Sequence, residues 1–271
     1  RENPDYLSVV FDKGGSADRS AIYNEYKSNR NATPDVILDS VPYIYNILNG
    51  LGITTLDLEG YEADDIIGTV AKRAEKKDFE VYMVTPDKDF AQLVTENIFL
   101  YKPARFGNDI EIMGVKEINK KFEIDSPIKV IDYLGMMGDS VDNIPGIPGV
   151  GDKTAKKFLK DYGSIEGLYK NTHNLKGKLK EKVEGNQELA MLSKKLATII
   201  TDVPIKYNLE NLKISKPSNE IIISIFEELE FKHSASNRSI YAQGALNVVK
   251  WFYQKPKNLY YMQTLIEDLY E

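Results

Sequence analysis

The N-terminal half of the chain alternates short apolar runs with amphipathic stretches. The runs at 6–11, 53–58 and 81–84 are rich in valine, isoleucine and leucine, which predicts buried β-strands. Apolar residues recur at helical spacing over 35–50 and 62–77, which predicts helices. Strand and helix therefore take turns along the chain, and this order predicts an α/β fold with a mostly parallel sheet flanked by helices.

The helix predicted before the second strand has a clear start. Thr33 is a suitable N-cap, and Pro34 and Asp35 follow it at the first helical positions. Pro42 lies within the apolar stripe and predicts a kink. The stretch before this helix, 13–30, is polar and mixed in charge, so we expect an irregular segment with some helix.

The second half of the chain has a different pattern. Past Gly114 it is helical almost throughout, interrupted by a glycine- and proline-rich stretch at 135–151. We therefore divide the chain into an α/β part over 1–113, a helical part over 114–233, and a linker with an aromatic-rich tail over 234–271. No role is predicted for the tail.

Composition narrows the chemistry. The chain has no cysteine and two histidines, so a bound metal has to take mainly carboxylate ligands. The net charge of -6 excludes a uniformly basic nucleic-acid binder, although charge can still be segregated along the chain. No apolar run reaches the roughly 20 residues of a membrane helix and no signal peptide is present, so we expect a cytoplasmic protein with no membrane partner.

Acidic residues recur where an α/β sheet places ligands. Asp12 follows the first predicted strand, and Asp87 and Asp89 follow the third. Others open the helix at 62 or flank the loop near 140. The complete set is Asp12, Glu62, Asp64, Asp65, Asp87, Asp89, Asp139 and Asp142.

Gathered in one crevice, these carboxylates predict a metal site, because like charges repel unless a cation neutralises them. Oxygen ligands favour Mg²⁺ or Mn²⁺, and two such ions about 3.5 to 4 Å apart catalyse phosphodiester hydrolysis. For the acidic residues that open the helix at 62, favourable interaction with the helix dipole is the alternative.

The most specific local pattern is Ile-Pro-Gly-Ile-Pro-Gly-Val-Gly at 144–151, followed by a lysine-rich helix start at 152–159. It matches a helix-hairpin-helix DNA-binding element, in which glycines expose backbone N–H groups to a phosphate and lysines add sequence-independent attraction. A structural turn before a solvated basic helix is the alternative. The predicted contacts are Gly149, Gly151, Lys153, Thr154, Lys156 and Lys157.

Together these motifs resemble the flap endonuclease superfamily, and in particular the 5′-nuclease domains of bacterial DNA polymerases I. The similarity extends from about residue 6 to residue 231. It rests on Phe11-Asp12, Tyr26-Lys27, Glu62-Ala63-Asp64-Asp65, Thr85-Pro86-Asp87-Lys88-Asp89, Gly138-Asp139-Ser140-Val141-Asp142-Asn143 and the glycine hairpin. The resemblance implies a PIN-like α/β fold and a divalent-metal-dependent 5′-3′ exonuclease or flap endonuclease of replication and repair.

The resemblance also implies roles for single residues. Asp12, Glu62, Asp64 and Asp65 would hold the metal favoured for catalysis, and Asp87, Asp89, Asp139 and Asp142 would complete the second site. Lys27 would act in catalysis together with Asp12 and Asp65, while Arg19, Tyr26 and Arg30 would contact DNA. An ordinary amphipathic helix face is the alternative for Tyr26 and Lys27. A monovalent cation at the hairpin is a further implied ligand.

The implied partner is branched duplex DNA with a 5′ flap or a 5′ end, and a fusion to a polymerase stays open. The family begins with a strand that carries another metal-binding aspartate ahead of anything present here, so we expect that strand and that ligand to be missing. Two alternatives therefore remain: a catalytically impaired DNA-binding fragment, and a PIN-like ribonuclease.

Overall fold

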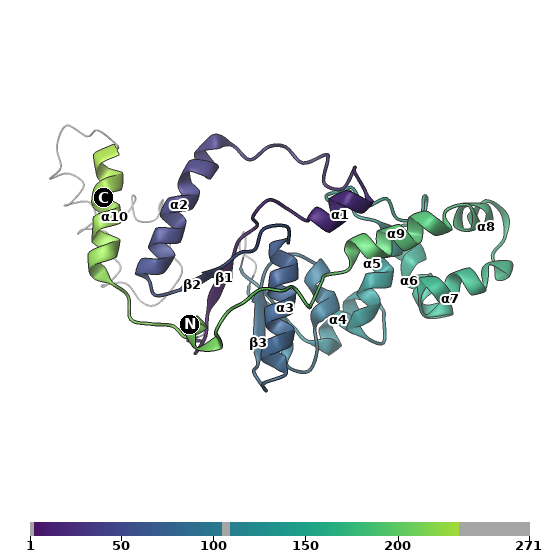
Figure 1. Cartoon of the computed structure of the whole chain (residues 1–271). Helices are drawn as coiled ribbons and strands as arrows, with labels where there is room; N and C mark the ends of the chain where they lie inside the picture. Colours follow the sequence, from purple (N-terminus) through teal and green to yellow (C-terminus); the bar gives the residue numbers. More distant parts are fainter. Residues whose placement is uncertain (1–2, 105–108, 233–271) are drawn as a thin grey trace, which may run out of the picture. The chain divides into compact units, whose positions relative to one another are not determined.

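The computed structural model describes residues 3–104 and 109–232 (Figure 1). The chain forms two compact units. Unit 1 comprises Arg1–Pro34 and Thr54–Lys213, and unit 2 comprises Asp35–Ile53 and Ile214–Glu271. The acidic residues, the hairpin and the basic residues singled out in the sequence all belong to unit 1.

Five short strands lie in unit 1: β1 (Ser8–Val10), β2 (Thr54–Leu56), β3 (Val81–Val84), β4 (Ile98–Lys102) and β5 (Glu111–Met113). β1 pairs with β2 in parallel, β3 pairs with β4 in parallel, and β4 pairs with β5 antiparallel. In the described part of the chain they form one sheet of two strands and one of three. The predicted α/β class with mostly parallel pairing is confirmed.

Helices make up the rest of unit 1. They are α1 (Ala17–Ile22), α3 (Ala63–Glu75), α4 (Val115–Phe122), α5 (Val130–Met137), α6 (Asp152–Tyr162), α7 (Ile165–Lys170), α8 (Gly177–Glu184) and α9 (Gln187–Ala197). The described residues of unit 1 also contain 3-10 helices, namely η1 (Asp89–Leu93), η2 (Pro127–Lys129), η3 (Thr172–Asn174) and η4 (Leu209–Leu212). η1 begins at Asp89, shortly after the end of β3.

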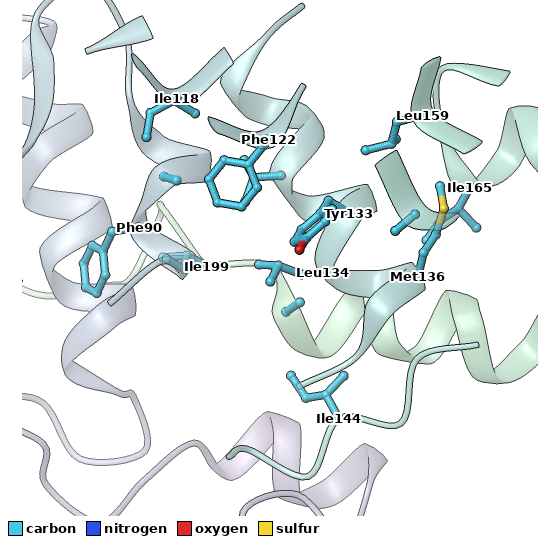
Figure 2. Close-up of a cluster of buried hydrophobic side chains, with 14 of the residues drawn as sticks. Phe90, Ile118, Phe122, Tyr133, Leu134, Met136, Ile144, Leu159, Ile165 and Ile199 are labelled. Atoms are coloured by element: carbon cyan, nitrogen blue, oxygen red, sulfur yellow. The ribbon is translucent and has the colours of Figure 1, made fainter. Parts of the chain in front are cut away.

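One hydrophobic cluster joins the sheet to the helices. Leu100 of β4 belongs to the same cluster as Phe158 of α6 and Ile165 of α7. Figure 2 shows α5 at its centre, where Tyr133 packs edge-on against Phe122 with ring centroids 5.2 Å apart. The boundary predicted at 113/114 therefore does not separate two hydrophobic cores, because both parts share this one.

Helix α3 is held by two hydrophobic clusters. Ala71 packs into the large cluster, whereas Ile66 packs with Leu56 of β2 and Val203 in a second, smaller one. Ile66 and Ala71 are almost completely buried. Packing in both clusters fixes α3, and this fixes the direction of the acidic residues in its first turn.

Unit 2 is a helix pair, α2 (Asp35–Gly50) and α10 (Asn219–Lys232), which lie side by side (Figure 1). Gly50 allows a close approach, since a Cβ there would lie 2.9 Å from Cγ1 of Ile222. The helix predicted over 35–50 is confirmed, with Pro42 inside it. The predicted linker and tail over 234–271 lie outside the described residues. Among the residues that the structure describes, no helix is long and apolar enough to cross a membrane.

Candidate active site

The first turn of α3 is the centre of the site. Glu62 occupies the N-cap position with an extended backbone, and Asp64 and Asp65 follow in the first turn. Asp12, which comes directly after β1, accepts a hydrogen bond from the backbone N–H of Ala63 at 2.7 Å. A carboxylate at a strand end therefore satisfies one of the free N–H groups that begin a helix.

Asp65 points to the protein interior, where it pairs with Arg19. The two guanidinium Nη atoms each donate to one Asp65 oxygen at 2.7 Å. Both side chains are buried, with residue exposures of 5% for Arg19 and 0% for Asp65. Burial alone lowers the pKa of Arg19, but the hydrogen bonds and charge of Asp65 outweigh it and raise that pKa above its usual value.

Arg19 also binds two backbone carbonyls at the end of α9. Its Nε donates to the Leu196 carbonyl at 3.0 Å and its Nη2 to the Thr198 carbonyl at 2.8 Å, while Nη1 reaches Glu62 at 3.3 Å. These contacts use all five N–H donors of a guanidinium. The expectation that Arg19 contacts DNA is therefore not met in this conformation, because no donor is left and the side chain is buried.

Glu62 is surrounded by donors. Its Oε1 accepts from Lys27 Nζ at 2.7 Å, and its Oε2 accepts from the Tyr26 hydroxyl at 3.1 Å as well as from Arg19. Burial and the charge of Glu62 raise the pKa of Tyr26, which stays a neutral donor. The structure thus brings the predicted Tyr26 and Lys27 onto a predicted metal ligand.

The segment that carries Lys27 lies against the loop that carries Asp142. The Lys27 N–H donates to the Asp142 carbonyl at 3.0 Å, and Lys27 itself has a left-handed backbone with φ of 55°. Arg30 forms an ion pair with the Asp142 carboxylate, and Asn29 donates to the Ser140 carbonyl at 2.7 Å. Lys27 and Arg30 are therefore positioned by loop contacts, and Arg30 keeps half of its side chain in solvent.

A second group of carboxylates, unlike Glu62 and Asp65, has no ion pair in the described residues. It consists of Asp64, Asp87 and Asp89. Asp64 accepts no hydrogen bond within the described residues, and Oδ1 of Asp89 is buried without a partner there. Burial and the charge of Asp87 raise the pKa of Asp64 to about 7, and burial and Asp87 do the same for Asp89. Lys27 opposes this shift at Asp64 and Lys88 opposes it at Asp89.

The sequence analysis did not assign a role to Lys88. Its Nζ lies 2.7 Å from Oδ2 of Asp139, and burial of Lys88 is outweighed by the Asp139 hydrogen bond and charge, so its pKa is raised. Asp139 also accepts from the Val141 N–H at 2.8 Å. One feature of the sequence could have predicted a role for Lys88. It lies between Asp87 and Asp89, two predicted site residues, and is therefore close enough to pair with another carboxylate of the same site, Asp139.

The carboxylates of the site have the chemistry that a divalent cation needs, but their side chains do not converge on one point in this structure. Within 3–104 and 109–232 no three His, Asp or Glu side chains are placed to hold a metal ion together. Nonetheless Asp64, Asp87 and Asp89 supply only oxygen, and the buried Asp89 Oδ1 lacks a partner. Hard oxygen donors with uncompensated negative charge suit Mg²⁺ or Mn²⁺. Asp65 fits this role less well, because both its oxygens are occupied.

The glycine hairpin lies between α5 and α6. Gly146 and Gly149 have φ of 64° and 85°, which only glycine adopts readily, and a Cβ on Gly146 would lie 2.5 Å from the Gly138 nitrogen. Gly151 is the N-cap of α6. Lys153 and Lys157 are exposed, Thr154 is half-buried, and Lys156 pairs with Asp152 at 3.0 Å. The glycines therefore form a tight turn directly before α6, and the DNA contacts of this hairpin stay a prediction.

Solved structures share this fold. The 5′-exonuclease of bacteriophage T5 with divalent zinc bound aligns with a TM-score of 0.60 at 20% identity, over 82% of both chains. The catalytic core of Rad2 in complex with DNA substrate aligns with a TM-score of 0.57 at 17% identity, over 82% of this chain and 73% of that one. The fold is thus the PIN-like fold of 5′-nucleases with a helical C-terminal part, as predicted.

Family models and relatives narrow the class further. The N-terminal resolvase-like domain of 5′-3′ exonucleases matches residues 1–123, and their C-terminal SAM fold matches residues 125–220. A 5′-3′ exonuclease of Aquifex aeolicus is 41% identical over 86% of this chain and 78% of its own length. The chain belongs to the 5′-3′ exonuclease family, whose members are nucleases that hydrolyse DNA.

DNA polymerase I of Bacillus subtilis is also similar, with 42% identity over 85% of this chain. The chain spans about a quarter of that relative, 26% of its length. The C-terminus of dihydrodipicolinate reductase is a further family model that matches, over residues 178–266. Its first part overlaps the SAM-fold match, and everything beyond 232 lies outside the described residues.

Proposed function

We propose that this chain hydrolyses phosphodiesters of DNA near 5′ ends and 5′ flaps, with Mg²⁺ or Mn²⁺ as cofactor. The observation that carries the proposal is the group Asp64, Asp87 and Asp89: none of these carboxylates forms an ion pair within the described residues, and Oδ1 of Asp89 is buried without a partner there. Asp12 and Asp139 stand beside this group on other elements. Carboxylates of this kind are what two divalent ions need.

The carboxylates and the basic residues of the site would have different roles in the reaction. Asp64, Asp87 and Asp89, with Asp12 and Asp139, would hold the cations, and the chemistry supplied by such ions is activation of a water and stabilisation of the leaving oxygen. Lys27, whose side chain is 20% exposed and whose Nζ lies 2.7 Å from Glu62, would place a positive charge next to the scissile phosphate. Arg30 would meet the DNA backbone with its exposed half.

The hairpin would bind the duplex part of the substrate. Its N–H groups at Gly149 and Gly151 and the exposed Lys153 and Lys157 at the start of α6 suit a phosphate without reading bases. A monovalent cation at the hairpin carbonyls belongs to the same proposal. The T5 enzyme in complex with DNA and metal ions, and Rad2 with DNA substrate, support this choice of partner.

The relatives also suggest a setting. Because the chain spans 26% of the Bacillus subtilis DNA polymerase I but 78% of the Aquifex aeolicus 5′-3′ exonuclease, both a fusion to a polymerase and a separate nuclease are compatible with it. In either form the reaction would serve replication and repair by removing 5′ flaps.

Cleavage of a labelled 5′-flap duplex tests the proposal. We expect cutting with Mg²⁺ or Mn²⁺, loss of cutting with EDTA, and a fall of at least about 100-fold for Asp87→Ala. Asp202→Ala, an exposed acidic residue outside the site, should cut like the wild type. Flap binding without cutting would instead identify an impaired DNA-binding fragment, and cutting of the matching RNA but not of DNA would identify a ribonuclease.

A further inference from the structure

Arg19 connects three parts of unit 1 that are far apart in the sequence. It lies on α1, its ionic partners Glu62 and Asp65 open α3, and its carbonyl partners Leu196 and Thr198 follow about 130 residues later at the end of α9. The N-cap of α1, Ser16, is also buried and accepts from the Arg19 N–H at 3.2 Å. One side chain therefore ties α1 to the turn that carries the acidic residues.

Both carboxylate oxygens of Asp65 accept hydrogen bonds within unit 1. Beyond its two bonds from Arg19, its Oδ1 accepts from the Ile200 N–H at 2.8 Å. Asp64, the neighbouring residue, has none of these partners within the described residues and faces Asp87 instead. Adjacent carboxylates on one helical turn therefore have different environments: Asp65 pairs with Arg19, and Asp64 lies in the acidic group with Asp87 and Asp89.

We propose that Arg19 is a positioning residue. By holding Asp65 and the carbonyls at the end of α9, it fixes the first turn of α3 so that Asp64 stays close to the charge of Asp87 and Glu62 stays within reach of Lys27. Asp65 is then the counter-ion of Arg19 and not a metal ligand. The metal-related part of this inference rests on the proposed function, whereas the ion pair itself does not.

The orientation follows from the cost of the alternatives. A carboxylate with 0% exposure needs a partner, and Arg19 supplies two parallel hydrogen bonds in the geometry that a carboxylate prefers. If Asp65 turned towards a bound cation, the buried Arg19 would lose its two short hydrogen bonds and keep only the 3.3 Å contact with Glu62 as counter-charge, which is unfavourable. The pair therefore keeps Asp65 out of the metal group and holds Glu62, which shares Arg19 through Oε2.

A double-variant cycle tests the inference. The variants are Arg19→Met, Asp65→Leu and the combination of both, which replaces a buried ion pair by apolar side chains. Arg73→Met is the matched control, because Arg73 lies on α3, the helix that carries Asp65, and also holds two carbonyls, those of Val203 and Ile205, without a carboxylate partner in the described residues. Thermal melts in EDTA and Mn²⁺ titrations of the folded proteins at low temperature are the two readouts.

We expect each single variant at the pair to lower the Tm by about 10 °C, and the combined variant to lower it by less than about 4 °C. Arg19→Met should weaken Mn²⁺ binding about tenfold, and the combined variant should restore it to within about twofold with the same number of ions. Arg73→Met should lower the Tm with unchanged Mn²⁺ affinity. A loss of Mn²⁺ affinity in Arg19→Met but not in Arg73→Met would show that Arg19 positions the carboxylates and does not only stabilise α3.

Two results would overturn the inference. A combined variant as unstable as the two single changes added together would show that Arg19 and Asp65 are not a coupled pair. A combined variant that regains its Tm but binds one Mn²⁺ fewer than the wild type would show that Asp65 is a ligand. A wild-type chain that binds no Mn²⁺ and cuts no flap would refute the proposed function, and the thermal cycle would still decide whether the pair exists.

Discussion

The acidic site contains two regions that differ in how their charge is balanced. In the paired group, Glu62 and Asp65 are contacted by Arg19, Tyr26 and Lys27 at distances of 2.7 to 3.3 Å. In the unpaired group, Asp64, Asp87 and Asp89 have each other as neighbours, and the pKa values of Asp64 and Asp89 are raised to about 7 by burial and by Asp87. Both groups meet at the first turn of α3.

This difference teaches where an external cation is needed. The paired group is neutralised by side chains of the protein, so its carboxylates are stable without a metal. In the unpaired group, repulsion between the carboxylates is unfavourable and is relieved by a bound cation or by a proton, and pKa values perturbed in this way are typical of catalytic sites. Counting carboxylates along the sequence therefore overstates the ligand number, because charge partners decide which carboxylates are free to bind.

Removing a carboxylate of the unpaired group should give the largest effect. Asp89→Asn keeps the size of the side chain but removes its charge, so we expect flap cleavage to fall by at least about 100-fold because a cation is held less well. Single-turnover cleavage with saturating Mg²⁺ and a separate DNA-binding titration measure this. Binding should stay within about twofold. Near-normal cleavage by Asp89→Asn would mean that the unpaired group is not the metal site.

Removing a cation of the paired group should act on stability. Lys27→Met leaves the buried Glu62 without its 2.7 Å donor, which should lower the free energy of unfolding by about 1.5 to 3 kcal/mol. Urea unfolding of the metal-free protein measures the loss. Lys72→Met, which breaks the more exposed pair with Glu75, should cost less than about 1 kcal/mol. Equal losses would mean that burial of Glu62 does not strengthen its pairing.

The sequence predicted the elements of this comparison but not their division. The strand at 81–84 and the helix at 62–77 were predicted closely, because the strand is a continuous apolar run and the apolar residues of the helix recur at helical spacing. The strands β4 and β5 were not predicted, and β5 has only three residues, too few for a period to show. A strand this short forms because it pairs with a neighbouring strand, and that pairing is not visible in its own sequence.

The site shows the same limit. The acidic residues were found because they follow strand ends, which is a local rule. Arg19, by contrast, was assigned to DNA although it bonds to Leu196 and Thr198, nearly 180 positions away. Nothing around 16–22 in the sequence indicates that partner. Burial of a charge depends on contacts between distant segments, and these cannot be read from spacing.

Removing repulsion should stabilise the metal-free protein. A raised pKa means that folded Asp64 binds a proton between about pH 4 and 7 that the unfolded chain has released, so its contribution to stability falls as the pH rises through that window. Asp64→Asn avoids this loss. In EDTA we expect it to raise the free energy of unfolding by about 1 to 2 kcal/mol at pH 8 and by almost nothing at pH 4.

Urea unfolding at both pH values, with and without Mg²⁺, measures this gain. Added Mg²⁺ should reverse the order at pH 8, because the wild type gains from binding the ion while Asp64→Asn gains less. A variant that is less stable than the wild type in EDTA at pH 8 would contradict the description of Asp64 as an unpaired carboxylate.

The smallest expected effect concerns the hydroxyl of Tyr26. Tyr26→Phe removes one neutral donor from Glu62, at 3.1 Å, while Lys27 and Arg19 still hold that carboxylate, so the loss should be about 1 kcal/mol. Urea unfolding is again the measurement, with Tyr162→Phe as a control because no hydrogen bond to that hydroxyl occurs in the described residues. If Tyr26→Phe cost as much as Lys27→Met, then hydrogen bonding, and not charge, would be what distinguishes the paired group from the unpaired one.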